Sequence, residues 1–283
     1  MSTEQQWIER IQAQLSASAQ QNFAAVPVPP FTIYINPDND SLWSNYAIPD
    51  VPVTGEIDPA LDLLCATFQK HGRQPRFEFI AEFTPQLAPA LAAYGFVEEM
   101  CTQLMICTPA TYQPVQSSTH VCFAQLAHEG PIAPFQEYMA VQRTAFGHDP
   151  TDAVGEAEAQ QFRARFTTTQ FFAAWLMDQS HTAQKELSPT ARAQAGEPAA
   201  AMVSVASLLP PHDGITEIAG IATAKPYRRQ GVAGALTASV VAQAFAQGLT
   251  AVFLTAADAA AGRVYERVGF RAIGTGMAYY LPT

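Results

Sequence analysis

The segment EIAGIATAKPYRRQGVAGAL, residues 217–236, carries most of the information about the fold. Its apolar first part predicts a strand, its basic centre predicts a turn, and its small residues predict a helix that begins near Gly231. Amides at a helix N-terminus have no intrahelical acceptor, so those of residues 229–234 can point at an anion with the positive end of the helix dipole behind them. Arg228 and Arg229 add positive charge. This segment therefore predicts a cradle for a phosphate-bearing ligand.

The overall composition limits the partners of the protein. The chain has 283 residues, a net charge of −10 and a sequence pI near 5.0. Two domains are expected at this length. An acidic protein lacks the basic field that nucleic acid or an anionic membrane requires, so neither is expected as a partner. The local basic turn instead suggests a small anionic ligand.

The cysteines and the N-terminus indicate a cytoplasmic protein. Cys65, Cys101, Cys107 and Cys122 show neither a zinc-binding spacing nor a disulfide framework, so we interpret them as buried thiols and expect no metal site. The first ten residues, MSTEQQWIER, lack the apolar core of a signal peptide. The uncharged residues 230–257 contain Gln, Ser and Thr and divide better into a helix and a strand than into a membrane span.

Apolar periodicity predicts alternating helices and strands throughout the chain. In the first half, helices are expected at residues 4–20, 58–71 and 84–93, with Thr84 as the cap of the third, and strands at 31–36, 42–48, 76–82 and 97–107. In the second half, strands are expected at 119–126, 171–177, 199–208, 216–223, 251–255 and 270–281, and helices at 132–146, 156–169, 231–248 and 259–267. The strand at 251–255 is apolar enough to be central and parallel.

The boundary between the two expected domains falls in a polar stretch. Residues 108–118 are rich in Pro, Ser, Thr and Gln and show no apolar period that would need burial. We therefore divide the chain into a domain at residues 1–112 and a domain at residues 118–283. A second polar connection is expected at residues 178–198.

The second half resembles the GNAT superfamily of acyl-CoA-dependent N-acyltransferases. The family's cofactor signature, Arg or Gln, two residues, Gly, one residue, then Gly or Ala, is matched by Arg228, Gly231 and Ala233. Its C-terminal signature is matched by Asp258, Tyr265, Gly269 and Phe270, with Asp at the first position where the family usually has Asn. Each signature alone is common, but their order and spacing among the expected strands and helices is specific.

The resemblance implies the fold and the cofactor. The expected class is α/β (α+β), with a mixed central sheet flanked by helices as in GNAT proteins. Residues 76–107 repeat the C-terminal part of that pattern, so a smaller, degenerate GNAT-like domain would precede the catalytic one. The implied cofactor is acetyl-CoA (coenzyme A), bound by Ile221, Ala222, Thr223, Arg228, Arg229, Gln230, Gly231, Val232, Ala233, Gly234 and Asp258.

Two residues are candidates for catalysis. Alternation along the strand predicts that Glu217, Ala219, Ile221 and Thr223 share one face. Glu217 stands where several members of the resembling family carry a general base, and an apolar setting would raise the pKa of its carboxyl; a solvated glutamate at the start of a strand remains the alternative. Tyr265 would lie beside the departing thiolate and protonate it; an ordinary core tyrosine is its alternative.

The leading function is transfer of an acetyl or similar short acyl group from acetyl-CoA to a primary amine of a small molecule, by direct attack in a ternary complex. No cysteine or serine stands in a recognisable nucleophile motif, so a covalent acyl-enzyme is not favoured. A coenzyme A-binding regulatory module without turnover is the main alternative, and a nucleotide-binding oxidoreductase is a third. The oligomeric state stays open, and a homodimer is compatible with the sequence.

Overall fold

The computed structural model describes residues 3–149, 151–177 and 201–282. The first half of the chain forms strands β1 (Ala24–Val28), β2 (Phe31–Ile35), β3 (Tyr46–Pro49), β4 (Arg76–Ile80) and β5 (Val97–Cys107), helices α1 (Thr3–Asn22), α2 (Asp58–Lys70) and α3 (Leu87–Tyr94), and the 3-10 turn η1 (Leu42–Ser44). The second half forms strands β6 (Val121–Gln125), β7 (Gln170–Leu176), β8 (Met202–Leu208), β9 (Ile215–Thr223), β10 (Ala251–Ala256) and β11 (Arg271–Tyr280), helices α4 (Ala133–Ala145), α5 (Glu156–Arg165), α7 (Val232–Ala246) and α8 (Ala259–Glu266), and the 3-10 turn η3 (Lys225–Tyr227).

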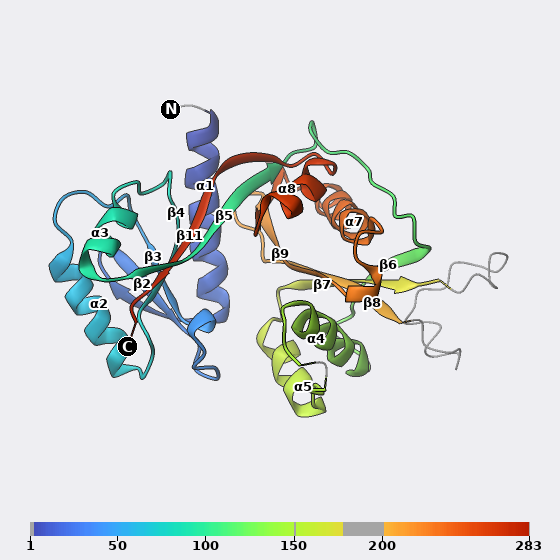
Figure 1. Ribbon diagram of the computed structural model, residues 1–283, viewed down its shortest axis with the longest axis horizontal. Helices are drawn as coiled ribbons and strands as arrows, with labels where there is room; N and C mark the ends of the chain where they lie inside the picture. The colour runs from blue at the N-terminus through green and yellow to red at the C-terminus, as the bar shows by residue number, and fades with distance from the viewer. Residues whose placement is uncertain (1–2, 150, 178–200, 283) are drawn as a thin grey trace.

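The described strands join into one mixed sheet that bends across two lobes (Figure 1). Its order is β1-β2-β3-β4-β11-β5-β10-β9-β8-β7-β6. Within each lobe a parallel pair is joined by a helix, β3-α2-β4 in the first and β9-α7-β10 in the second. The predicted α/β class with a mixed central sheet flanked by helices is therefore confirmed.

The two halves exchange their last strands. Strand β5 ends the first half but pairs with β10 of the second, and β11 ends the second half but pairs with β4 of the first. Strands β5 and β11 also pair with each other, antiparallel, at the centre of the sheet. The proposed division into residues 1–112 and 118–283 thus follows the repeat in the sequence, but each repeat completes its sheet with a strand of the other.

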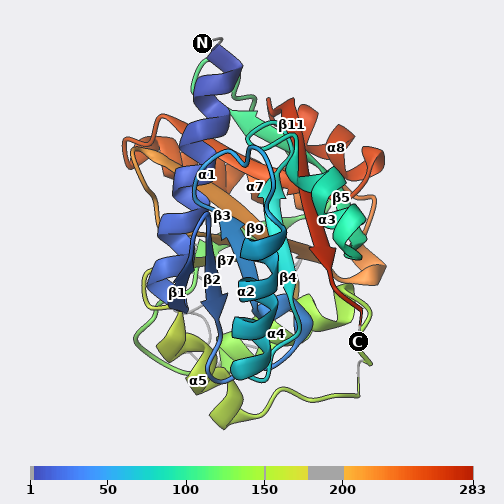
Figure 2. The ribbon, with the colours of Figure 1, turned by 90° about the vertical axis from the view of Figure 1, so that its left-hand side faces the viewer.

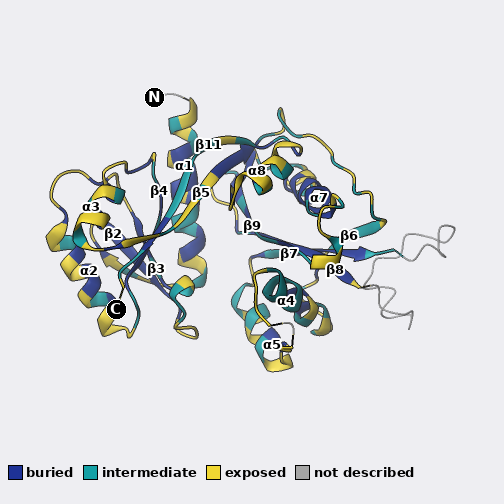
Figure 3. Ribbon diagram, viewed as in Figure 1, coloured by how far each residue is buried: buried dark blue, intermediate teal, exposed yellow. Residues whose placement is uncertain are grey.

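Helices cover both faces of the sheet and form separate cores. In the second lobe α7 packs on one face and α4 with α5 on the other, and in the first lobe α2 and α3 lie on one face (Figures 1 and 2). Helix α1 lies between the lobes, where it contacts β9 as well as β1 and β4. Its Arg10 pairs with Asp213 at 2.9 Å, and the Gln14 amide donates to the Pro210 carbonyl at 3.0 Å. Buried residues run through both lobes along the strands (Figure 3).

Most predicted elements occur close to their expected bounds, and the structure corrects three expectations. It also adds an edge strand, β1, in the passage before residue 31 where no strand was predicted. Thr84 does not cap α3, which begins after Gln86; its hydroxyl accepts the Val53 amide at 3.0 Å. Strand β10 is parallel only to β9 and antiparallel to β5. Cys101 is exposed, in the first part of β5, where no residue before Leu104 is fully buried, although Cys65 and Cys107 are buried as expected.

The predicted linker at residues 108–118 is packed against the second lobe. The Tyr112 hydroxyl donates to the Ala238 carbonyl at 3.1 Å, and its ring meets Phe245 edge-on. Val115 packs against the core that α7 and α8 cover. Tyr112 and Val115 therefore anchor this segment, although its sequence has no regular apolar period. The predicted connection at 178–198 lies outside the described residues.

Candidate active site

Strands β9 and β10 separate in the middle of the second lobe. Their parallel ladder runs from the Ile215–Ala251 pair to the Glu217–Phe253 pair and stops there. Both strands continue, β9 to Thr223 beside β8 and β10 to Ala256 beside β5. The edge of β9 at residues 218–223 that faces β10 has no strand partner among the described residues. An extended ligand can therefore pair with this edge as an added strand would.

A β-bulge in β9 changes which residues share a face. Three residues of β8, from Val205 to Ser207, are matched by four of β9, from Ala219 to Ala222, and Gly220 takes a left-handed φ of 61°. The bulge turns Ile221 toward the α7 core and Ala222 toward the α4 core. The prediction that Glu217, Ala219, Ile221 and Thr223 share one face was therefore wrong beyond Ala219.

The turn between β9 and α7 has the backbone expected of an anion cradle. Arg229 and Gly231 both take left-handed conformations, with φ of 62° and 79°. Gly231 is the N-cap of α7 and offers no side chain, and the first backbone hydrogen bond of the helix runs from Ala235 to Gly231. The amides of the first helical turn, Val232 to Gly234, have no intrahelical acceptor, which is the arrangement that binds an anion at a helix N-terminus. Val232 is buried against β7 and β8 and fixes this end of the helix.

The side chains of this turn have structural partners that the sequence did not reveal. Arg228 donates to the carbonyls of Thr223 and Ala145, at 2.9 and 3.0 Å, and so ties the end of β9 to the end of α4. The Gln230 carbonyl accepts from the hydroxyls of Ser117 and Ser118, both at 3.0 Å. Among the described residues, Arg229 has no ion-pair or hydrogen-bond partner. Arg229 is therefore the cation best placed to meet a ligand.

Helix α8 carries the other two predicted residues. Asp258 is its N-cap, and the carboxylate accepts the Ala261 amide at 2.8 Å. Tyr265 is partly buried between α8 and the α7 core and meets Phe270 edge-on. Burial, followed by the charge of Asp258, raises the pKa of Tyr265 to about 12. The phenol therefore stays protonated at neutral pH and is available as a hydrogen-bond donor.

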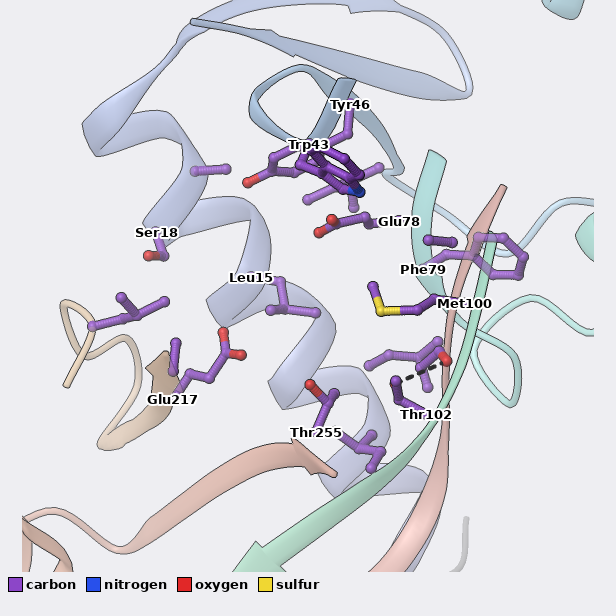
Figure 4. Close-up of a pocket in the computed structure, with 18 of the residues that line it drawn as sticks. Leu15, Ser18, Trp43, Tyr46, Glu78, Phe79, Met100, Thr102, Glu217 and Thr255 are labelled. Atoms are coloured by element: carbon purple, nitrogen blue, oxygen red, sulfur yellow. Dashed lines mark hydrogen bonds between the residues drawn. The ribbon is translucent and has the colours of Figure 1, made fainter. Parts of the chain in front are cut away.

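Glu217 projects into a cavity of about 540 Å³ between the two lobes (Figure 4). Burial raises the pKa of its carboxyl to about 8, and the negative charge of Glu78 adds to the shift. No described residue donates a hydrogen bond to this carboxyl. Glu217 is partly exposed and lines this cavity; its role as a base stays a prediction. Neither Tyr265 nor the turn at residues 228–234 lines this cavity, because both lie toward the α7 face of the sheet.

The first lobe supplies cavity residues that the sequence analysis missed. Glu78 of β4, Tyr46 of β3 and Trp43 of η1 face Glu217 across the cavity (Figure 4). Burial and the charges of Glu78 and Glu217 hold the pKa of Tyr46 well above its usual range, so it stays neutral. A glutamate inside the apolar strand RFEFI was the signal available in the sequence. The sequence could not show that Glu78 lies opposite Glu217, because the two residues come close only when strand exchange brings the lobes together.

Comparison with known proteins identifies the second lobe. Residues 152–270 match the model of the Acetyltransferase (GNAT) family. The chain contains a GNAT acetyltransferase domain and is an acyltransferase. The match spans α5 to α8, including the separated strands and the turn before α7. No curated protein matches this sequence.

Solved structures share the fold over nearly the whole chain. A GCN5-related N-acetyltransferase from Kribbella flavida aligns with a TM-score of 0.74 at 22% identity, covering 98% of this chain and 96% of that one. One from Sphaerobacter thermophilus aligns with a TM-score of 0.57 at 13% identity, covering 98% and 92%. A tandem GNAT protein from the clavulanic acid biosynthesis pathway aligns with a TM-score of 0.57 at 11% identity, covering 99% and 95%. The predicted tandem GNAT arrangement agrees with these folds.

Proposed function

We propose that this GNAT protein transfers an acetyl or similar short acyl group from acyl-coenzyme A to a primary amine of a small molecule, by direct attack in a ternary complex. One observation carries the proposal. Glu217, a carboxyl without a hydrogen-bond partner among the described residues, stands at the last paired position before β9 and β10 separate. A base is thus placed where a cavity meets an open strand edge.

The separated strands and the turn before α7 fit the acyl donor. The open edge at residues 218–223 suits an extended chain of amides such as pantetheine, and the amides of Val232, Ala233 and Gly234 suit a diphosphate. Arg229 adds a free cation. Coenzyme A would supply an acyl group activated as a thioester. The side chain of Asp258 already caps α8, so we assign it no more than a backbone-positioning role near this site.

Glu217 takes the proton from the amine. An acceptor arrives as an ammonium ion, which cannot attack a carbonyl until it loses a proton. A carboxylate whose pKa is raised to about 8 is a stronger base than an ordinary glutamate and is closer in proton affinity to an alkylamine. Glu217 passes this first proton to solvent. When the neutral amine attacks, the new C–N bond forms and the C–S bond breaks, and Glu217 takes the second proton that the nitrogen gives up, while the departing thiolate receives a proton from the α8 side.

Tyr265 stabilises the departing sulfur from the α8 side. Its hydroxyl donates a hydrogen bond to the thiolate and can pass its proton on, provided that solvent restores it, since the pKa of about 12 keeps the phenol protonated beforehand. The base Glu217 and the acid Tyr265 then lie on opposite faces of the sheet, and the gap where β9 and β10 separate lies between the two residues.

The experiment is release of free thiol from acetyl-CoA in the presence of a panel of primary amines, together with calorimetric titration of coenzyme A. Turnover with at least one amine, lost in Glu217→Gln while coenzyme A affinity is kept, supports the proposal. Tight binding of coenzyme A without turnover of any amine would favour the regulatory module instead. Absence of coenzyme A binding would overturn both.

A further inference from the structure

The charge of the cavity between the lobes is entirely acidic. Of the described residues that line it, only Glu78 and Glu217 carry a carboxyl group, and none is a lysine, arginine or histidine. Arg76 is buried behind Glu78 and is already paired, with Glu78 at 2.5 Å and with Glu99 at 2.6 Å. A ligand carboxylate or phosphate would therefore find no cation free to meet it, and desolvating it beside two glutamates would be costly.

The remaining wall is mainly apolar and presents two unusually exposed side chains. Trp43 is 67% exposed and Met100 is 43% exposed, although both belong to the cavity lining. The indole nitrogen of Trp43 donates to Glu99, which also holds Arg76. The ring is thus fixed while its face stays open. An exposed but fixed aromatic face is typical of a binding surface for an apolar or cationic group.

Half of the polar side chains in the lining already have partners, and among the described residues the hydroxyls of Ser18, Tyr46 and Thr255 have none. The Asn22 amide donates to the Ser18 carbonyl at 3.1 Å, and the Thr102 hydroxyl donates to the Gly276 carbonyl at 3.0 Å. A ligand rich in hydroxyls would lose its hydration without gaining an equal set of hydrogen bonds. The cavity therefore disfavours sugar amines as well as amino acids.

We propose that the acceptor is a hydrophobic amine without an acidic group, bound between the two lobes with its ammonium group toward Glu217 and its apolar body against Trp43, and with Glu78 as a binding residue from the first lobe. This inference rests on the proposed function for the acylation of the amine. The binding of the amine in the cavity is a separate claim. It gives the first lobe a direct part in recognising the substrate. A volume of about 540 Å³ accommodates an aromatic ring with a short side chain and leaves room for a larger body.

The test compares amines that differ by one group. Phenethylamine and tryptamine are matched with phenylalanine and tryptophan, which add only a carboxylate, and glucosamine represents hydroxyl-rich amines. Binding is measured by calorimetry with the full chain and no acyl donor, and turnover is measured with acetyl-CoA. We expect each hydrophobic amine to bind and react at least tenfold better than its carboxylate-bearing match, and glucosamine to be inactive.

Two variants locate the selectivity in the first lobe. Glu78→Gln should weaken phenethylamine binding about tenfold and reduce the discrimination against phenylalanine, because a negative charge leaves the cavity. Trp43→Ala should weaken tryptamine binding about fivefold or more, with partial recovery in Trp43→Phe. Glu56→Gln, the same chemical change at an exposed site of the first lobe, is the control and should bind as the native chain does. Thermal unfolding of each variant verifies that Arg76 remains satisfied by Glu99.

The outcomes separate this inference from the proposed function. Selective binding of hydrophobic amines without acyl transfer would overturn the proposed function and keep the assignment of the cavity. Acyl transfer to phenylalanine or glucosamine at rates equal to phenethylamine would keep the function and overturn the assignment. Unchanged selectivity in both Glu78→Gln and Trp43→Ala would show that the first lobe does not contribute to recognition of the acceptor. That result would also overturn the assignment of the cavity.

Discussion

Glu78 on β4 and Glu217 on β9 come from different halves of the chain and face one cavity, and the charge of Glu78 helps to raise the pKa of the Glu217 carboxyl. Tyr46 and the buried Arg76 complete this group of coupled side chains. The base of the proposed reaction is therefore tuned by the lobe that carries no cofactor signature. The pH dependence of the reaction should report this coupling.

The acidic limb of the kcat/KM profile should shift to lower pH in Glu78→Gln. Removing a nearby negative charge makes ionisation of Glu217 easier, so the base becomes active at lower pH than in the native chain. Glu217→Gln should remove the limb together with most of the activity. Rates measured between about pH 6 and pH 10 test both. A limb that stays in place in both variants would assign the titration to another group.

Protein stability should also depend on Glu217. Its folded-state pKa of about 8 lies above the usual 4.5, so folding favours the protonated form, and its contribution is fully present at acidic pH and is lost as pH rises toward 8. Relative to Glu217→Gln, the native chain should lose at most about 5 kcal/mol of unfolding free energy between acidic and alkaline pH. Urea unfolding of both proteins at several pH values measures the difference; parallel curves would contradict the raised pKa.

Tyr265→Phe should lower kcat by about 100-fold while acyl-CoA affinity changes little, because hydrogen bonding to the leaving sulfur strengthens only as the C–S bond breaks. The ring still fills its place beside Phe270, so the fold should be kept. Single-turnover kinetics and coenzyme A titration separate the two effects. Full activity in the variant would mean that the sulfur leaves without help from α8.

Arg229→Ala should weaken binding of coenzyme A by about threefold to tenfold and leave binding of dephosphorylated pantetheine unchanged, since an exposed cation acts on phosphate charge. Arg267→Ala, at another exposed arginine that forms no ion pair with a described residue, is the matched control. Arg228→Ala is a poorer probe, because it also releases the ends of β9 and α4. The effect should shrink at high salt. Equal losses for both ligands would argue against a phosphate contact.

A fragment of residues 118–283 should fail to fold as a soluble domain, despite the sequence boundary near residue 118. It keeps the whole GNAT family match but loses β5, which leaves the edge of β10 open and removes both partners of β11. Adding residues 1–112 as a separate chain should restore solubility. Circular dichroism tests whether the fragment folds, and gel filtration tests whether it is soluble and not aggregated. A folded, coenzyme A-binding fragment alone would show that the exchanged strands are dispensable.

Local signals sufficed to predict most of the fold and the position of the turn before α7. Apolar periods located nearly every strand and helix, and the spacing of Arg228, Gly231 and Ala233 identified the turn, because these features depend on neighbours in sequence. The acceptor cavity depends on β4 meeting β9 across the lobes, and the bulge at Gly220 depends on its register with β8. Contacts between residues far apart in the sequence produce no periodic pattern of apolar residues. For this reason the sequence analysis did not predict Glu78 and Trp43 as site residues.

The exchange of last strands also governs the order in which the chain can fold during synthesis. Strand β4 ends at Ile80, yet its partner β11 begins only at Arg271, so about 190 residues are added between them. During synthesis, the edge of β4 stays unpaired until β11 of the second half has been made. Non-local pairing of this kind slows folding and exposes an edge to other chains. Native structure, and with it the cavity between the lobes, can therefore appear only after β11 has been made.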